Sequence, residues 1–508
     1  MSAPKAEPAS AHMGGDNKFP APEYAETVLG PAFVHAQEHH LAHLFRLHRA
    51  HGTMLAEQGL LTKQEISSLL AALDATERDL AARGPSAYTG EHEDLFFFVE
   101  SELKRHVGPE VAGRLHTGRS RNDIDHALFK MKFRERVDSL VTHLAKLIEA
   151  LIARAEADAG TIILAYTHGQ PAQPSTYGHY LGAVIETLLR DAERLEQARA
   201  VLDLCPMGAA AITTTGFPLN RQRMAEFLGF ADILRNSYGC IAGADYAAGL
   251  FAAVKVLALN LGRVAQDMAF WTSFEVGQLR FSDGFVQISS IMPQKRNPVP
   301  VEHMRLMASL CAGRCDAVLT ALHNTPFTDM NDNEHETHGQ GYEALDMAER
   351  VLTLMVGVIR SASIDEKRAR VNIERSFATI TELADTLVRE ERIPFVAAHH
   401  IAANLARAMQ ASGETLSTVP YATFSAIFEK QIGRAPTLAE ARFRHVVTPD
   451  HFVSVRTLPG GPAPAALAES LAIYRKGADA VRARLAAHAG AQARAEATLK
   501  AAAERFRS

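Results

Sequence analysis

The chain has 508 residues, of which 47% are hydrophobic and 22% are charged, and its formal net charge is -5. This composition is that of an ordinary globular protein, and it excludes collagen-like, fully disordered and highly charged classes. With 53 basic against 58 acidic residues, the chain gives no electrostatic reason to expect a nucleic-acid or membrane partner.

The N-terminal segment, residues 1–20, is rich in alanine, proline, serine and glycine and lacks the apolar stretch of a signal peptide. We therefore expect a disordered lead rather than a targeting signal. No run of about 18 uninterrupted apolar residues occurs, so a transmembrane helix is not expected. The 4 cysteines are too few for a disulfide framework and indicate a reducing compartment. Together these features predict a cytoplasmic protein.

Long helices dominate the remainder of the chain. Apolar residues recur every three or four positions over residues 137–152, which predicts a helix with one apolar stripe. Similar patterns predict helices at about 177–204, 246–271, 298–322 and 339–361. Helices of roughly twenty residues would be about 30 Å long at 1.5 Å per residue. Such lengths indicate an elongated bundle, in which the nearly all-apolar helix at 246–271 would lie in the middle.

The predicted fold class is therefore all-α, with three helical domains. Residues 21–120 are expected to form an N-terminal helical domain and residues 121–363 the central bundle of five long helices. Residues 364–508 are expected to form a C-terminal helical domain. Strand patterns are weak throughout, and association between chains could cover the apolar faces that one chain leaves open.

The first of three polar segments is HTGRSRND, residues 116–123, just before a long helix. Arginine side chains, short hydroxyl and amide donors, and free N–H groups at a helix N-terminus suit the binding of a carboxylate. The alternative is a capping segment with Ser120 or Asn122 as the N-cap.

The second segment, YTHGQPAQP at residues 166–174, places His168 among turn-forming residues. A histidine can relay or donate a proton in such a place. The alternative is that His168 has no catalytic role, as holds for most of the 23 histidines in the chain.

The third segment, SDGFVQISSIMPQKRNP at residues 282–298, has no helical or strand periodicity although it lies between two long helices. Loops of this length within compact domains are uncommon and are often functional lids. Paired serines, a lysine and an asparagine could supply a base or nucleophile and donors to an anion. The segment contains no G-x-S-x-G or S-x-x-K motif, which disfavours covalent serine hydrolysis. The alternative is a mobile surface connection.

Metal and nucleotide sites are not expected. The sequence has no H-E-x-x-H, Walker or dinucleotide-binding motif. Cys311 and Cys315 share an apolar helix face, where buried structural thiols are favoured over metal ligands. The histidine-rich stretch favours a polar helix face over a metal site; its members are His35, His39, His40, His43, His48 and His51.

Together the three segments resemble the argininosuccinate lyase branch of the aspartase/fumarase superfamily. SSIMPQKRNP resembles the superfamily's signature loop, whereas LHTGRSRND and THGQPAQP resemble two blocks of that branch. The similarity extends over nearly the whole chain. It implies a homotetramer in which each active site is built from three subunits. It also implies a small-molecule substrate, no cofactor, and anti elimination of an amine from an N-substituted aspartate with release of fumarate.

The resemblance also implies roles for single residues. Ser289 would remove the proton from the aspartyl Cβ as an alkoxide, and Lys295 and Asn297 would bind the carboxylate that takes up charge. His168, oriented by Glu302, would help protonate the leaving nitrogen or position the substrate. The remaining expected substrate-binding residues are Ser120, Arg121, Asn122, Thr167, Gln170 and Ser290.

The chain departs from the family where the amine half of the substrate would bind. Phe33 and Gln37 replace a serine and an aspartate, Phe96 replaces a histidine, and Ile124 and Ile288 replace a glutamine and a glycine. Family tyrosine, glutamine and lysine contacts align with three further residues: Asp329, Glu334 and Thr337.

Loss of an acid at Gln37 would remove a partner for a guanidinium, and an unpaired buried charge costs several kcal/mol. The sequence therefore favours cleavage of another N-substituted aspartate, as in ethylenediamine-disuccinate (EDDS) lyase. Argininosuccinate lyase is the alternative, and a catalytically silent, crystallin-like structural protein is an alternative of another class. An O-linked or adenylosuccinate-type lyase is disfavoured by TGRSRND. The identity and stereochemistry of the amine do not follow from the sequence.

Overall fold

The computed structural model describes residues 19–507. The disordered lead expected at residues 1–20 lies almost wholly outside the described residues. Four buried cysteines carry free thiols in the structure, and the expected burial of Cys311 and Cys315 is confirmed.

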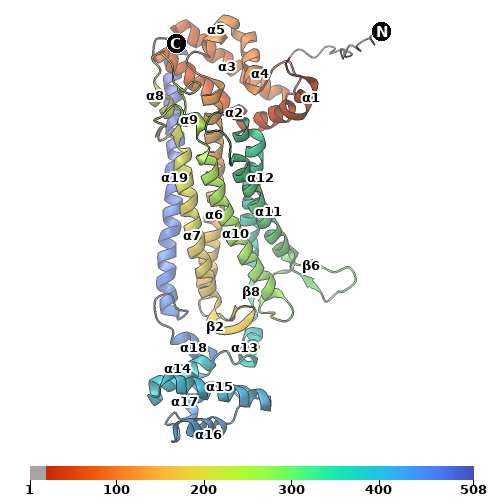
Figure 1. The fold of residues 1–508 in the computed structure, drawn as a ribbon, viewed down its shortest axis with the longest axis vertical. Helices are drawn as coiled ribbons and strands as arrows, with labels where there is room; N and C mark the ends of the chain where they lie inside the picture. Colours follow the sequence, from red (N-terminus) through yellow and green to blue (C-terminus); the bar gives the residue numbers. More distant parts are fainter. Residues whose placement is uncertain (1–18, 508) are drawn as a thin grey trace, which may run out of the picture.

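Long helices running along the molecule's long axis form its centre (Figure 1). They are α6 (Arg121–Ala157), α7 (Tyr177–Leu202), α10 (Asp245–Thr272), α11 (Val299–Leu322), α12 (His335–Ser361) and α19 (Pro464–Arg507). The first five confirm the five predicted helices. α6 starts earlier than its apolar stripe, because Ser120 and Asp123 form a capping box that begins the helix there. Its 37 residues correspond to a length of about 55 Å.

α10 is the core helix of the bundle and packs against α7, α11 and α12. The segment Gly239–Thr272 is long and apolar enough to cross a membrane by length and composition, with a mean hydropathy of 1.5. Here 56% of that apolar window is buried inside the protein, as the sequence predicts for a central bundle helix. Three large aliphatic side chains on α10 and α11 nevertheless remain exposed: Leu259, Leu306 and Leu310.

An N-terminal helical unit caps one end of the bundle (Figure 1). It contains α1 (Pro22–Tyr24), the π-helix η1 (Ala25–Leu29), α2 (Gly30–Glu57), α3 (Lys63–Arg83), α4 (Leu95–Val107) and α5 (Pro109–Arg114). Two short helices from the central region, α8 (Arg221–Leu228) and α9 (Gly239–Ala242), lie at the same end.

A C-terminal helical unit lies at the opposite end and has its own apolar core. It contains α13 (Glu366–Arg375), α14 (Ile380–Glu391), α15 (Phe395–Ser412), α16 (Tyr421–Ile432), α17 (Glu440–Val446) and α18 (Pro449–Ser454). The prediction of one C-terminal domain over residues 364–508 is wrong for α19, which leaves this unit and packs along α6 and α7. Leu499, Ala502 and Ala503 of α19 then join the core of the N-terminal unit.

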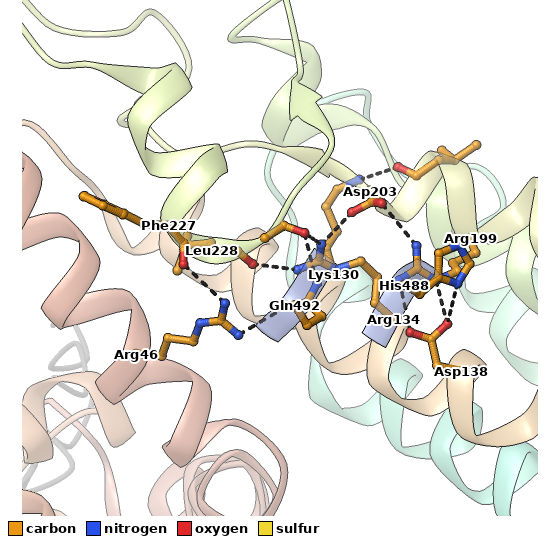
Figure 2. Close-up of polar contacts among 12 residues, drawn as sticks. Arg46, Lys130, Arg134, Asp138, Arg199, Asp203, Phe227, Leu228, His488 and Gln492 are labelled. Carbon is orange, nitrogen blue, oxygen red and sulfur yellow. Dashed lines mark hydrogen bonds and ion pairs between the residues drawn. The ribbon is translucent and has the colours of Figure 1, made fainter. Parts of the chain in front are cut away.

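A buried polar network fastens α19 to the bundle (Figure 2). Arg134 on α6 donates to Asp203 at 2.6 Å and to the carbonyl oxygens of Gly229 and Leu228 at 2.6 and 3.1 Å. Arg199 on α7 also pairs with Asp203, at 3.1 Å. Gln492 on α19 donates to the same Gly229 carbonyl at 3.0 Å. One set of side chains thus joins α6, α7, α19 and the end of α8.

Short antiparallel strand pairs join the helices, which the weak strand patterns did not predict. β1 (Ile162–Thr167) pairs with β2 (Gln170–Thr176), β5 (Leu279–Arg280) with β8 (Ser363–Ile364), and β6 (Gln287–Ile288) with β7 (Arg296–Asn297). β3 (Leu204–Cys205) and β4 (Asp232–Ile233) pair in parallel. The β1–β2 hairpin lies between the bundle and the C-terminal unit, where the fully buried Gln278 bonds both backbone groups of Leu164.

Candidate active site

The HTGRSRND segment is held in place by buried histidines of α2. His48 Nδ1 lies 3.0 Å from Nη1 of Arg119, and His51 Nε2 lies 2.9 Å from the carbonyl oxygen of Thr117. His40 is buried too, and its Nε2 lies 3.1 Å from the hydroxyl of Tyr342. The prediction of a polar helix face is therefore wrong for these three histidines, because each is buried and one nitrogen of each ring has a partner inside the protein.

Ser120 is the N-cap of α6, so the capping interpretation is confirmed. Asp123, which the sequence did not single out, fixes the same turn. Its carboxylate accepts from the N–H groups of Ser120 at 2.8 Å, Gly208 at 2.9 Å and Ala210 at 3.1 Å. Burial raises the pKa of Asp123 to about 6 despite these three bonds.

Arg121 and Asn122 follow on the first turn of α6. Nη1 of Arg121 donates to Glu93 at 2.9 Å and to Asp94 at 2.7 Å. Nδ2 of Asn122 donates to Asp329 at 2.9 Å. Carboxylates of the chain itself thus surround both side chains, and carboxylate binding by Arg121 and Asn122 stays a prediction.

His168 lies at the exposed tip of the β1–β2 hairpin. His168 and Gly169 both have positive φ, 54° and 72°, as a two-residue hairpin turn of the I′ type requires. Thr167 and Gln170 flank them as the last paired residues of the hairpin. The turn projects three predicted site residues together from one end of the bundle: Thr167, His168 and Gln170.

Ser289 lies at the start of a loop that projects sideways from the bundle beyond β6 (Figure 1). Its Oγ accepts from the backbone N–H of Met292 at 3.1 Å and of Ile291 at 3.5 Å. Such donors favour negative charge on the oxygen. Ser290 and Lys295 are exposed on the same loop, and Asn297 ends it in β7. Ile288 and Ile291 are 78% and 83% exposed.

One chain does not bring these three segments together. Ser120 and the His168 hairpin lie at opposite ends of α6, and 37 helical residues separate them by about 55 Å. Glu302 is exposed on the first turn of α11, and no hydrogen bond links it to His168 in the described part of the chain. The predicted orientation of His168 by Glu302 is therefore absent within one protomer.

A cavity of about 240 Å³ lies beside Asn122, between α2, α6 and the short helix η3 (Asn331–Asn333). Phe33, Phe96 and Phe129 line part of its wall. Burial, with the neighbouring Asp329, raises the pKa of Glu334 to about 7. The lining of the cavity is rich in acidic residues: Glu93, Asp94, Asp125, Asp329, Glu334 and Glu336.

Two of the aligned residues named above, Gln37 and Thr337, lie outside this cavity. Gln37 does not line the cavity; it accepts from the Ser86 N–H at 2.9 Å and donates to the Ser86 carbonyl at 3.3 Å. Thr337 does not line it either, since its hydroxyl bonds the Asp332 carbonyl at 2.7 Å. Other carboxylates, among them Asp125, line the cavity instead. Arg121 and Asp125 are i and i+4 on one helix, as are Asn122 and His126, a spacing that could have revealed the cavity wall.

Comparison with known proteins agrees with this architecture. A family model described as "Lyase" matches residues 32–313, and one described as "Argininosuccinate lyase C-terminal" matches residues 377–454. The chain is 52% identical to argininosuccinate lyase 2 of Agrobacterium fabrum, over 90% of this chain and 91% of the relative. It is 32% identical to argininosuccinate lyase 1 of Shouchella clausii, over 90% and 92%.

Among solved structures, an EDDS lyase variant with bound fumarate matches with a TM-score of 0.85 and 29% identity, over 95% of this chain and 97% of that one. Fold and relatives together define a fumarate-releasing carbon–nitrogen lyase. Within that class, the chain belongs to the argininosuccinate lyase branch of the aspartase/fumarase superfamily.

Proposed function

We propose that the protein cleaves an N-substituted aspartate, with argininosuccinate as the first candidate, and that it works in the cytoplasm. The relative that is 52% identical carries the name argininosuccinate lyase, whereas the EDDS lyase match is 29% identical. The comparisons thus favour cleavage of argininosuccinate over the EDDS-type reaction that the sequence favoured. The EDDS-type reaction remains the second candidate because of the EDDS lyase structural match.

In the proposed reaction, Ser289 Oγ takes a proton from the aspartyl Cβ. The electrons of that C–H bond form the C=C bond of fumarate, and the Cα–N bond breaks with its electron pair going to nitrogen. His168, with Glu302, would help protonate that nitrogen or position the substrate. Lys295 and Asn297 would bind the carboxylate that takes up charge, with the positive charge supplied by Lys295, and Ser290, Thr167 and Gln170 would complete its binding. No cofactor enters these steps.

The observation that carries the proposal is the bonding of Ser289 Oγ to the backbone N–H of Met292 at 3.1 Å. A serine hydroxyl is a weak base, and donors aimed at its oxygen stabilise the alkoxide that the reaction needs. The exposed Lys295 on the same loop would add a positive charge.

The test is Ser289→Ala, assayed by the ultraviolet absorbance of fumarate released from argininosuccinate. Loss of a general base should lower kcat by about 10²–10⁴-fold. Ser282→Ala is the matched control, since Ser282 is an exposed serine of the same segment, residues 282–298, that precedes β6 and lies outside the proposed site. Full activity in Ser289→Ala on the best substrate would overturn the assignment of the base.

We further propose a homotetramer with active sites shared between three subunits. The separation of about 55 Å along α6 and the exposed Leu259, Leu306 and Leu310 support this arrangement. Mixing inactive Ser289→Ala chains with inactive His168→Asn chains should restore activity, because some sites then receive both intact residues. A monomer in sedimentation analysis, or no recovery on mixing, would contradict the shared site.

A further inference from the structure

Asp123 holds the first turn of α6 from inside the protein. Its side chain is fully buried, and its Oδ1 accepts from the N–H of Ser120 at 2.8 Å, which closes the capping box. Its Oδ2 accepts from the N–H groups of Gly208 at 2.9 Å and Ala210 at 3.1 Å. One carboxylate thus joins the turn that carries Ser120 and Asn122 to a loop that follows α7.

That loop, residues 206–216 (the Gly208 loop), has a strained backbone. Gly208, Ala210 and Thr214 all have positive φ, of 85°, 52° and 64°. Such a conformation is uncommon for alanine and a genuine outlier for a β-branched residue such as threonine. It persists only where the surrounding structure fixes it, and it is typical of functional sites. The two N–H groups that point at one oxygen of Asp123 supply such a constraint, because successive backbone N–H groups form a concave binding site for an anion.

Other contacts fix the Gly208 loop on its far side. Arg221 on α8 donates from Nε to the carbonyl oxygen of Met207 at 3.0 Å. Leu219, between the loop and α8, packs against Gly118, where an added Cβ would lie 2.9 Å from Leu219 Cδ1. The loop is therefore a fixed support against which the HTGRSRND segment, residues 116–123, rests.

We propose that Asp123 is a positioning residue for the proposed reaction. Through its bonds to the Gly208 loop, it holds Ser120 and Asn122 in the geometry that binds a substrate carboxylate. Asp123 does not touch the substrate, because it is fully buried and both of its oxygens already accept from backbone N–H groups. This inference rests on the proposed function, since it concerns the binding of the same substrate.

The role of Asp123 predicts which kinetic constant depends on it. The carboxylate that takes up charge is assigned to Lys295 and Asn297, so Ser120 and Asn122 bind one whose charge stays constant during the elimination. An interaction that is equally strong in the ground state and the transition state sets KM and leaves kcat unchanged. Loss of the positioning should therefore raise KM.

Asp123→Asn removes this anchor with little change in volume. The amide has one accepting oxygen, whereas the three N–H groups face both oxygens of Asp123. Either the N–H of Ser120 or those of Gly208 and Ala210 then face an N–H₂ group instead of an acceptor. We expect KM for argininosuccinate to rise by about 10- to 100-fold, as for the loss of one hydrogen bond to a charged group. The value of kcat should stay close to that of the wild type.

Glu391→Gln is the matched control. Glu391 is a buried carboxylate of the C-terminal unit that accepts from the N–H groups of Thr437 and Leu438, both at 2.7 Å. Its loss should lower the melting temperature without raising KM. Gly208→Ala tests the anchor from the loop, because φ is 85° and the added Cβ would lie 2.6 Å from Arg221 Cγ. KM should rise in this variant too, although no residue of α6 is changed.

A wild-type KM in folded Asp123→Asn and Gly208→Ala proteins would overturn the inference. A lower kcat at unchanged KM, matched in Glu391→Gln, would also overturn it, because a smaller folded fraction gives that result. If Asp123→Asn does not fold, KM in Gly208→Ala decides.

Calorimetric binding of fumarate separates this inference from the proposed function. Fumarate binding that weakens in Asp123→Asn, with no cleavage of argininosuccinate by the wild type, would support the positioning role and overturn the proposed substrate. Cleavage of argininosuccinate, with KM and fumarate binding unchanged in Asp123→Asn and Gly208→Ala, would support the proposed function and overturn the positioning role.

Discussion

Replacing Arg134 by alanine should destabilise the protein severely without touching the proposed site. The side chain is 4% exposed and donates to Asp203 and to the carbonyl oxygens of Leu228 and Gly229 (Figure 2). Each carbonyl left buried without a donor costs about 1–3 kcal/mol. Gln492 still serves Gly229, and Arg199 still pairs with Asp203, which limits the loss. We expect a decrease of about 3–5 kcal/mol in the free energy of unfolding, as for other broken buried pairs.

Urea unfolding followed by circular dichroism, at one protein concentration, measures this effect. The matched control is Arg235→Ala, because Arg235 pairs with Asp232 at 2.9 Å but is 77% exposed. The control should change the free energy of unfolding by less than about 1 kcal/mol. If the two variants unfolded at the same urea concentration, the buried network would contribute no more than a surface pair, and the reasoning would be refuted.

Three further predictions concern acid, a glycine and a glutamine. Burial holds the pKa of His51 and of His126 at about 3, so both stay neutral at pH 5 in the folded protein while unfolded histidine, with a pKa of about 6.5, gains a proton. The free energy of unfolding is therefore unchanged above pH 6.5 and falls by about 2 kcal/mol per histidine at pH 5. Urea unfolding at the two pH values measures this, because the midpoint should move to a lower urea concentration at pH 5. An unchanged midpoint would contradict the prediction. Gly118→Ala should lower activity and thermal stability, because φ at this residue is 72° and the added Cβ would lie 2.9 Å from Leu219 Cδ1. A melting temperature and activity equal to those of the wild type would argue against backbone strain at Gly118. Gln278→Leu should increase hydrogen exchange in the β1–β2 hairpin, because it removes two backbone partners, and unchanged protection would show that the hairpin is held by other contacts.

The long helices could be predicted because their signal is local. In α6 the buried Leu140, Leu144, Leu147 and Leu151 recur at the helical period, and such spacing needs no knowledge of a partner. The hairpin around His168 carried no comparable signal, since β2 contains two prolines and its burial does not alternate. Its conformation is set by the turn and by Gln278.

The site was predictable in part, for a similar reason. Ser120 could be recognised as a cap from its neighbours, and the exposed loop of Ser289 from its lack of periodicity. The acidic cavity could not, because Asp329 reaches Asn122 across 207 positions of sequence. Burial of His48 and His51 was also missed, because a polar ring enters a core only when distant groups bond it.

The packing of α19 against the bundle and the N-terminal unit has a consequence for how the chain folds during synthesis. Leu499, Ala502 and Ala503 complete the same core as Phe33 and Leu44, and Arg505 pairs with Glu57 at 2.7 Å. A nascent chain emerging from the ribosome therefore holds an incomplete N-terminal core until Leu499, Ala502 and Ala503 have been made. Contacts between such remote stretches make acquisition of the native state slow, and a premature stop codon before Leu499 would leave the earliest-made helices partly uncovered.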